Sequence, residues 1–309
     1  MEIIRIMLPI IVMLGMGYII QKTGFITEKG MDGVKTYLTR IALPATIFHA
    51  MATADLSGNT VRIIIVMFAM LSVAMIIGFL LRPFIEEPYK KYLPFLITIF
   101  EGGMLSYPLY ENLCGSDKLV NVVIVDIAGC IFGFGLFFGI LSLVEKGTKF
   151  SLKSMGKVAI TSPTFDAVVL GLLCNVTGLM KVLMDSCIAS SYIAVKDMIV
   201  APLTAMILLY VGYSLRIERR FLKVCIKTIL LRMLVMAVLG AIVIFVLSDI
   251  TADKYMLAAF LIMFVTSPTF SLPGFVSDKE AAGYFAMATS MYVIITIIGY
   301  AVIAMALFA

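Results

Sequence analysis

The sequence predicts an all-α integral membrane protein of ten transmembrane helices, arranged as two inverted five-helix repeats. The prediction rests on composition, on a series of long apolar segments, and on prolines and glycines that recur in both halves. Hydrophobic residues make up 62% of the 309 residues and charged residues 14%. A soluble domain carries about 25% charged residues. A soluble core of this length could not bury so much apolar surface, so membrane lipid must cover it.

The individual spans follow from segment length, because a membrane-spanning helix needs about 20 mostly apolar residues. The segment at the N-terminus has no small-residue cleavage site, and we interpret it as the first span rather than a signal peptide. Ten segments qualify as spans: 3–21, 36–53, 61–82, 93–113, 119–144, 159–180, 186–212, 222–247, 255–276 and 281–308.

The distribution of basic residues predicts the orientation of the chain. Of the 24 Lys and Arg residues, 17 lie in loops after odd-numbered spans, 5 lie on the other side, and Lys196 and Arg232 lie within spans. Basic loops stay in the cytoplasm, so we expect a multi-pass cell-membrane protein with both termini outside. Basic residues that lie mainly in the loops between apolar segments do not form a nucleic-acid surface, and we expect no nucleic-acid partner.

The two halves of the chain show a weak internal repeat. A basic linker, residues 145–158, separates a first five-span repeat (1–144) from a second (159–309). Pro9 and Gly24 in the first half, and Pro163 and Gly178 in the second, are each separated by 15 positions. Because each half contains an odd number of spans, the two repeats would have opposite topology.

Spans four and nine contain the strongest helix breakers. Interior prolines remove a backbone hydrogen bond, and paired glycines weaken a helix further. Two broken helices at matching repeat positions are typical of a transporter binding site, although kinked packing helices would give the same pattern. The predicted substrate or ion site consists of Glu101, Gly103, Ser106, Pro108, Pro268, Thr269, Ser271 and Pro273.

Glu101 is the principal charged residue of this predicted site. An acid within a span is costly and usually functional. It could carry a proton, or it could hold a sodium ion together with carbonyl groups freed at the Gly102-Gly103 break. The alternative is that Glu101 lies in water at the end of a span. We expect Glu101 to bind the coupling cation rather than the substrate.

Four other charged residues within spans are candidates for coupling or pairing: Asp126, Asp166, Lys196 and Asp197. Adjacent helical residues point about 100° apart, so we expect Lys196 and Asp197 not to form a simple bridge. Lys196 could instead pair with Glu101, Asp126 or Asp166, or meet an anionic substrate. Asp166 lies near a helix start, where an acid is also favourable for purely structural reasons.

No resident metal or cofactor is expected. The five cysteines form no CxxC pair, and the single histidine, His49, cannot form a metal site alone. The transported ion would be sodium or a proton. The chain also has no glycine-rich nucleotide-binding loop, so ATP-driven transport is disfavoured.

The chain resembles the auxin efflux carrier family, including its bacterial malonate- and malate-permease-like members. The resemblance implies a scaffold subdomain and a transport subdomain, with spans four and nine crossing beside an organic-anion substrate that is moved by an elevator motion. It rests on Gly24-Phe25, Ala42-Leu43-Pro44, Gly103, Pro108, Ser162-Pro163, Ala201-Pro202, Gly212 and Ser267-Pro268.

Three positions depart from the family pattern. Many members have asparagine at Glu101, glycine at Ser106 and asparagine at Thr269. An amide donates hydrogen bonds to a carboxylate, whereas an ionised glutamate repels one. An anionic substrate therefore requires Glu101 to be protonated or cation-bound during transport.

The sequence as a whole predicts a secondary transporter of small organic anions and not an enzyme. A homodimer is left open, because the sequence does not specify an oligomeric state. A channel or a receptor is the main alternative. An intramembrane aspartyl enzyme using Asp126 and Asp166 is the weakest, since no GxGD, HExxH or GxSxG motif is present.

Overall fold

The computed structural model describes residues 2–54, 56, 58–146 and 162–308. Every regular element in these ranges is helical, which confirms the all-α prediction. The predicted linker 145–158 lies outside the described residues, except for its first two positions.

The first half of the chain contains eight α-helices and six short helical turns of other types. In order these are α1 (Glu2–Thr23), α2 (Glu28–Tyr37), a π-helical turn (Leu38–Ala42), α3 (Leu43–Thr53), α4 (Gly58–Leu80), two 3-10 turns (Arg82–Phe84 and Tyr89–Tyr92), α5 (Leu93–Thr98), a π-helical turn (Gly102–Ser106), α6 (Tyr107–Cys114), a 3-10 turn (Ser116–Lys118), α7 (Val120–Phe132), a π-helical turn (Gly133–Phe137) and α8 (Phe138–Lys146).

The second half, as described, contains seven further α-helices. They are α10 (Pro163–Val176), α11 (Leu179–Met184), α12 (Ala189–Val200), α13 (Leu203–Ser214), α14 (Leu222–Val246), α15 (Lys254–Val265) and α16 (Lys279–Phe308), with 3-10 turns at Arg219–Phe221 and Leu272–Phe275.

Several of these helices have the length and composition of membrane spans. In the described part of the chain, six helical stretches are long and apolar enough, and α10 and α15 are apolar but shorter. The six are Arg5–Thr23, Gly58–Leu80, Val120–Glu145, Ala189–Ser214, Arg219–Val246 and Lys279–Phe308. The protein is therefore a multi-pass membrane protein. The arrangement of ten spans as inverted repeats stays a prediction.

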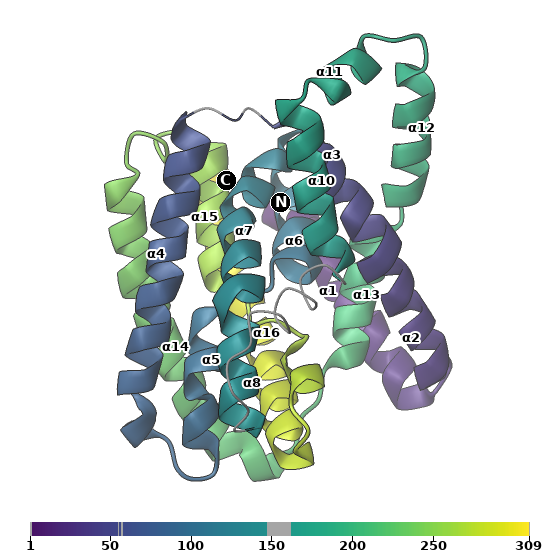
Figure 1. Ribbon diagram of the computed structural model, residues 1–309. Helices are drawn as coiled ribbons and strands as arrows, with labels where there is room; N and C mark the ends of the chain where they lie inside the picture. Colours follow the sequence, from purple (N-terminus) through teal and green to yellow (C-terminus); the bar gives the residue numbers. More distant parts are fainter. Residues whose placement is uncertain (1, 55, 57, 147–161, 309) are drawn as a thin grey trace.

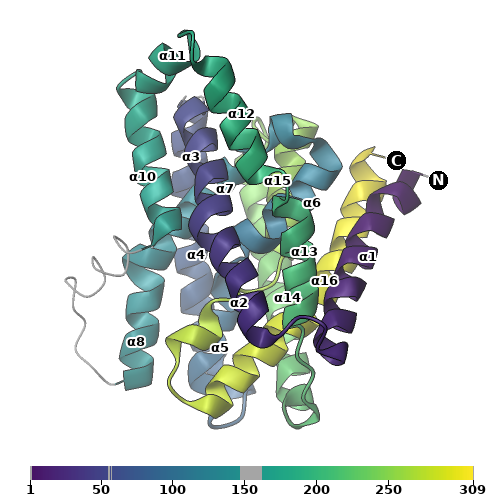
Figure 2. The ribbon, with the colours of Figure 1, turned by 90° about the vertical axis from the view of Figure 1, so that its right-hand side faces the viewer.

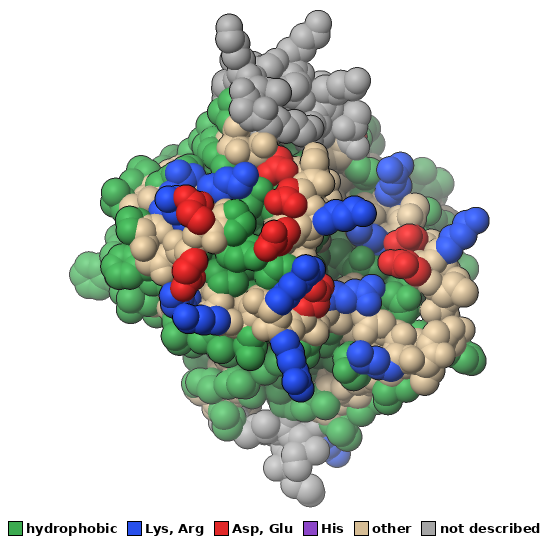
Figure 3. All heavy atoms as spheres, turned by 90° about the horizontal axis from the view of Figure 1, so that it is seen from below, with side chains coloured by type: hydrophobic (Ala, Val, Ile, Leu, Met, Phe, Trp, Pro, Cys, Tyr) green, Lys and Arg blue, Asp and Glu red, His purple; other side chains and the backbone are tan. Residues whose placement is uncertain are grey.

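The helices form two groups that lie side by side (Figures 1 and 2). Group 1 contains α1–α3 and α10–α13, and group 2 contains α4–α8 and α14–α16. Each group combines helices from both halves of the chain. Both chain ends lie at one end of the molecule (Figure 2), and Figure 3 views the opposite end, where basic and acidic side chains are interspersed.

Group 1 is held together by close contacts between the two halves. A Cβ atom added to Gly17 of α1 would lie 2.0 Å from the carbonyl oxygen of Leu209 in α13. One added to Gly212 of α13 would lie 2.1 Å from the carbonyl oxygen of Leu14. Only glycine permits backbones to approach this closely, as in other membrane helix pairs. The predicted spans one and seven thus pack directly on each other at these two glycines.

Candidate functional site

The site begins with two interrupted segments of group 2. Helix α5 ends at Thr98, residues 99–101 are not helical, and the chain turns again at Gly102–Ser106. Helix α15 ends at Val265, and residues 266–271 are likewise not α-helical. The backbone N–H of Glu101 donates to the carbonyl of Ser267 at 2.9 Å, so the two breaks touch. We call this contact the crossing.

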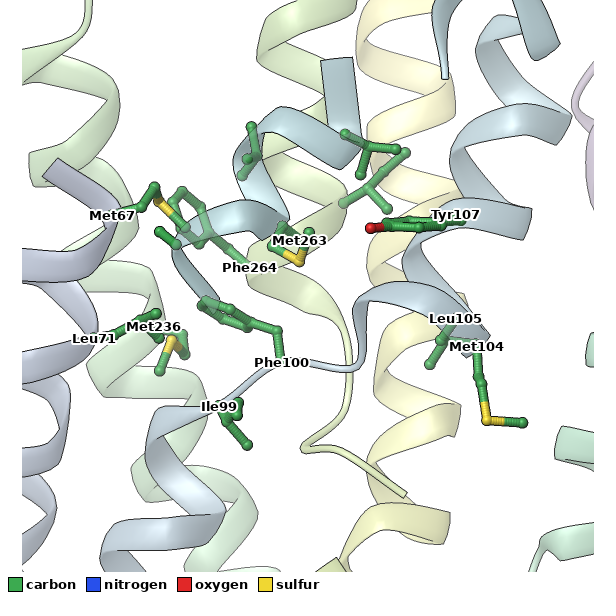
Figure 4. Close-up of a cluster of buried hydrophobic side chains, with 14 of the residues drawn as sticks. Met67, Leu71, Ile99, Phe100, Met104, Leu105, Tyr107, Met236, Met263 and Phe264 are labelled. Atoms are coloured by element: carbon green, nitrogen blue, oxygen red, sulfur yellow. The ribbon is translucent and has the colours of Figure 1, made fainter. Parts of the chain in front are cut away.

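Apolar side chains surround the crossing (Figure 4). The view shows Ile99 and Phe100 on the extended segment, with Met263 and Phe264 of α15 beside them. The rings of Phe100 and Phe264 lie 5.9 Å apart between centroids. These apolar side chains offer no hydrogen bonds, so the backbone groups freed at the breaks must find partners elsewhere in the protein.

Ser106 supplies one such partner. Its hydroxyl donates to the carbonyl of Glu101 at 3.0 Å, and its backbone N–H donates to the same oxygen at 3.1 Å. Its side chain also lies 3.3 Å from the hydroxyl of Thr266 across the crossing. Ser106 is fully buried, so its role here is to satisfy the broken backbone and to join the two segments.

The Glu101 carboxylate bridges both breaks. One oxygen, Oε2, accepts from the backbone N–H of Phe270 at 2.7 Å, and the other, Oε1, accepts from that of Met104 at 3.2 Å. Glu101 thereby caps the turn that begins at Gly102. The side chain is buried, so the alternative of a glutamate in water at the end of a span is wrong. Two backbone donors from different segments converge on one carboxylate, which is the arrangement that recognises an anion.

A cavity of about 420 Å³, which we call the crossing cavity, lies against this carboxylate. Group 2 contributes four of the predicted site residues to its wall: Glu101, Gly103, Thr269 and Ser271. Asp126 of α7 lines it as well. Group 1 contributes a cation and three hydroxyl groups that were not among the predicted site residues: Lys35, Thr39, Ser162 and Thr164.

Asp126 is the second acid of the crossing cavity. The Tyr107 hydroxyl donates to its Oδ2 atom at 2.9 Å. A Cβ atom on Gly102 would lie 2.1 Å from that same oxygen, so glycine at position 102 leaves the space that the carboxylate fills. Asp166, in the first turn of α10, does not line this cavity. The two aspartates that an aspartyl enzyme would need therefore do not line one cavity.

The remaining predicted residues are three prolines, and none of them lines the crossing cavity. Pro108 is in the first turn of α6, and Pro268 belongs to the non-helical 266–271 segment. Pro273 lines a different, smaller cavity with Glu28 and Arg216. Prolines break the helices here but do not form the wall of the crossing cavity.

The expectation that Lys196 and Asp197 do not form a bridge is wrong. Their charged atoms lie 2.5 Å apart, with 61% of the Asp197 side chain exposed. The expectation considered only the directions in which adjacent side chains leave a helix. The four-carbon stem of lysine is flexible enough to bend back to its neighbour. Lys196 pairs with neither Glu101 nor Asp126 in this structure and lines another cavity.

That other cavity, the end cavity, has a volume of about 730 Å³. It lies between the two groups, near the end of the molecule that carries the termini, because the connections after α3, α6 and α14 contribute to it. The same two helices, α3 and α7, line both cavities. On α7 the end cavity is lined by Val120, Asn121 and Ile124, and the crossing cavity by Asp126, Gly129 and Cys130. The two cavities thus adjoin along these helices.

Arg232 is the most important residue that the prediction missed. It lies in the middle of α14, is 1% exposed, and donates from Nη1 to the carbonyls of Leu96 and Ile97 at 2.7 and 3.0 Å. Its Nη2 atom donates to the carbonyl of Thr266 at 3.0 Å. A basic residue at the centre of an apolar span was a visible signal. In the described ranges, no group of three or more His, Cys, Asp or Glu side chains could hold a metal ion.

Comparison with known proteins identifies the family. The model of a family described as membrane transport protein matches residues 2–308. The chain is also 26% identical over 176 residues to an uncharacterized transporter from Methanothermobacter thermautotrophicus. That alignment covers 56% of this chain and 57% of the relative, so it spans little more than half of either protein. With nearly the whole sequence matched, this chain belongs to the membrane transport protein family, the auxin efflux carrier family that its sequence resembles.

Proposed function

We propose that this transporter is a secondary carrier of small organic anions, driven by protons that bind Glu101. The observation that carries the proposal is the pair of backbone N–H donors, from Phe270 and Met104, on the Glu101 carboxylate. A substrate carboxylate has the same shape and charge as the end of a glutamate side chain. Glu101 therefore holds the donors that a carboxylate substrate would use.

Protonation of Glu101 removes this competition. A neutral carboxyl group is a weaker acceptor than a carboxylate, since charge-assisted hydrogen bonds are roughly twice as strong as neutral ones. Once Glu101 is neutral, the N–H groups of Phe270 and Met104 are available to the substrate. Binding of a proton then favours binding of the anion, and the two move together.

The surroundings of the carboxylate favour a proton over a sodium ion. Hard metal cations in proteins are held by several oxygen ligands. The nearest backbone partners of both carboxylate oxygens are N–H groups, and N–H groups repel a cation. The carbonyl of Glu101 itself is taken by Ser106. A proton needs only one oxygen of the carboxylate and no further ligands.

The wall of the crossing cavity suits a small anion when Glu101 is neutral. Lys35 provides a positive charge, and Thr39, Ser162 and Thr164 provide hydroxyl donors from group 1. A volume of about 420 Å³ lies in the range of about 300–1,000 Å³ that is usual for small-molecule sites. The substrate would then be held between polar groups of group 1 and the crossing in group 2.

The arrangement of the two groups supports an elevator motion. Both breaks, Glu101 and Asp126 belong to group 2, whereas Lys35 and Ser162 belong to group 1. The two cavities lie at the boundary between the groups and adjoin along α3 and α7. Sliding of group 2 along group 1 would carry the crossing from one cavity position toward the other, which is alternating access.

Substrate-induced thermal stabilisation of the purified protein tests this proposal. A ligand that binds the folded state stabilises it in proportion to its occupancy. We expect malonate, malate or another small carboxylate to raise the unfolding temperature, and to raise it more in mildly acidic than in alkaline buffer. In Glu101→Gln the stabilisation should be equal in both buffers, which controls for ionisation of the ligand. The proposal fails if only organic cations stabilise the protein, or if wild type and Glu101→Gln show the same dependence on pH.

A further inference from the structure

Arg232 stands where backbone carbonyls from both interrupted segments converge. Leu96 and Ile97 belong to the last turn of α5, and Thr266 directly follows the last residue of α15. The last four carbonyls of a helix have no partner within the helix. Arg232 binds three such carbonyls from two different helices.

The charge of Arg232 matches the charge of these helix ends. A helix C-terminus carries roughly −0.5 of an elementary charge, so two ends amount to about one negative charge. An arginine side chain carries one positive charge and remains protonated in proteins. The ion pairs found in the described part of the chain join other residues and give Arg232 no carboxylate partner. The helix ends themselves are its counter-charge.

Aromatic rings complete the environment of the guanidinium group. Its central carbon lies 5.5 Å from the ring centre of Phe100 and 5.0 Å from that of Tyr292. Both distances are within the range of cation–π attraction. Arg232 lines neither the crossing cavity nor the end cavity. It is therefore sealed within group 2 and does not meet the substrate.

Arg232 also fixes the position of Glu101, because the two residues contact neighbouring carbonyls of the segment that follows α15. Its guanidinium holds the carbonyl of Thr266, and the next carbonyl, that of Ser267, accepts the N–H of Glu101. In α5 it binds the carbonyls of Leu96 and Ile97, which lie shortly before Glu101 in the chain. Displacing Arg232 would release both segments that orient the Glu101 carboxylate.

We propose that Arg232 is a resident cation that takes the place of a bound metal ion at the crossing. Converging helix C-termini and unwound carbonyls are the arrangement by which membrane carriers coordinate inorganic cations. Here a covalently attached guanidinium satisfies the same kind of carbonyls. The crossing therefore needs no sodium, and Arg232 acts as a positioning residue for Glu101.

The first test uses the wild-type protein. Its unfolding temperature is measured in sodium, potassium and choline chloride at equal ionic strength. We expect the three values to agree, since the carbonyls have no room for an added ion. Specific stabilisation by sodium or potassium over choline would overturn the proposal, whatever the transported substrate is.

The second test compares Arg232→Lys with Arg232→Gln. Lysine keeps the positive charge with a compact donor group, and glutamine keeps hydrogen-bond donors without the charge. We expect unfolding temperatures in the order wild type, Arg232→Lys, Arg232→Gln, and stabilisation of Arg232→Gln alone by sodium or potassium over choline. A role limited to packing would give no such selectivity for small cations.

The control for this test is Arg62→Gln, which changes an arginine whose side chain is 43% exposed and paired with Asp249. It should differ little from wild type in every salt. The proposal is overturned if Arg232→Gln is at least as stable as Arg232→Lys, or if it gains nothing from small cations. If Arg232→Gln yields no folded protein while Arg232→Lys does, the need for the charge is supported. If neither folds, the wild-type comparison of salts decides.

Discussion

Glu101 and Arg232 are an acid and a base at the same crossing, yet their surroundings differ in kind. The carboxylate of Glu101 accepts from two N–H groups and lines a cavity, whereas the guanidinium of Arg232 donates to three carbonyls and is sealed in protein. A helix break exposes N–H groups on one side and carbonyls on the other. The acid lies at the donors and the base at the acceptors. Glu101 lines a cavity, so its carboxylate can exchange hydrogen-bond partners with a ligand. Arg232 lines no such cavity and keeps its carbonyl partners.

Reversing the charge on the sealed side should have the largest effect. In Arg232→Glu a carboxylate would face three carbonyl oxygens without a donor. Breaking a buried charged interaction costs about 3–5 kcal/mol, and repulsion from the carbonyls would add to this. We expect the variant to lose its folded, monodisperse form in size-exclusion chromatography. Arg62→Glu, a reversal in an exposed ion pair, should remain folded, and equal behaviour of the two variants would contradict the role of the carbonyls.

Filling the space beside the second acid should have the next largest effect. In Gly102→Ala the new methyl group would meet the Asp126 carboxylate, because a Cβ atom at position 102 would lie 2.1 Å from its Oδ2 atom. Overpacking of this kind costs about 1–3 kcal/mol, so the unfolding temperature should fall. Gly135→Ala is the matched control, because no atom lies within 4 Å of its added Cβ. If both variants unfold at the same temperature, Asp126 is free to move away from the crossing.

The sequence indicated where the chain would break but not what would hold the broken ends. Pro268, Gly102 and Gly103 marked the interruptions because their effects on a helix are local. Glu101 was identifiable because a charge in a span is rare. The three carbonyl partners of Arg232, by contrast, lie 34 to 136 positions away in the chain. Periodicity places a residue in a helix but does not specify which distant backbone atoms it will meet.

The wall of the crossing cavity was only half predictable for the same reason. Thr269 and Ser271 lie beside the prolines that drew attention to span nine. Lys35 and Thr39 come from a segment with no unusual local signal, and they reach the cavity only because group 1 packs against group 2. Lys196 had a clear signal as a base within a span, yet it pairs with its own neighbour Asp197.

Removing the charge of Asp126 should have a moderate effect and sharpen the comparison with Glu101. In Asp126→Asn the amide oxygen can still accept the hydrogen bond from Tyr107. We expect a change in stability of about 1 kcal/mol and accumulation of substrate under a pH gradient similar to that of wild type. Loss of gradient-driven accumulation in Asp126→Asn would move the coupling role from Glu101 to Asp126.

The smallest effect is expected for a contact between the groups and outside the crossing. The Thr204 hydroxyl of α13 donates to Glu111 of α6. Thr204→Val removes that hydrogen bond. Because both residues are only half-buried, water can partly replace it, and stability should fall by about 0.5 kcal/mol, the lower end of the usual range for one hydrogen bond, as measured by thermal unfolding. Thr23→Val is the control, because Thr23 is exposed and bonds only to carbonyls of its own helix. A destabilisation by Thr204→Val as large as that of Gly102→Ala would mean that the boundary between the groups is as rigid as the crossing.

Transport by Glu101→Gln in liposomes tests the central claim most directly. The variant keeps the size of the side chain and removes the proton that the claim requires. Liposomes containing wild type, Glu101→Gln or Asp126→Asn are given an inward proton gradient and a labelled carboxylate that stabilises the protein. We predict that wild type and Asp126→Asn accumulate the label, whereas Glu101→Gln exchanges label for internal substrate but does not accumulate it. Accumulation by Glu101→Gln to the wild-type level would contradict the account.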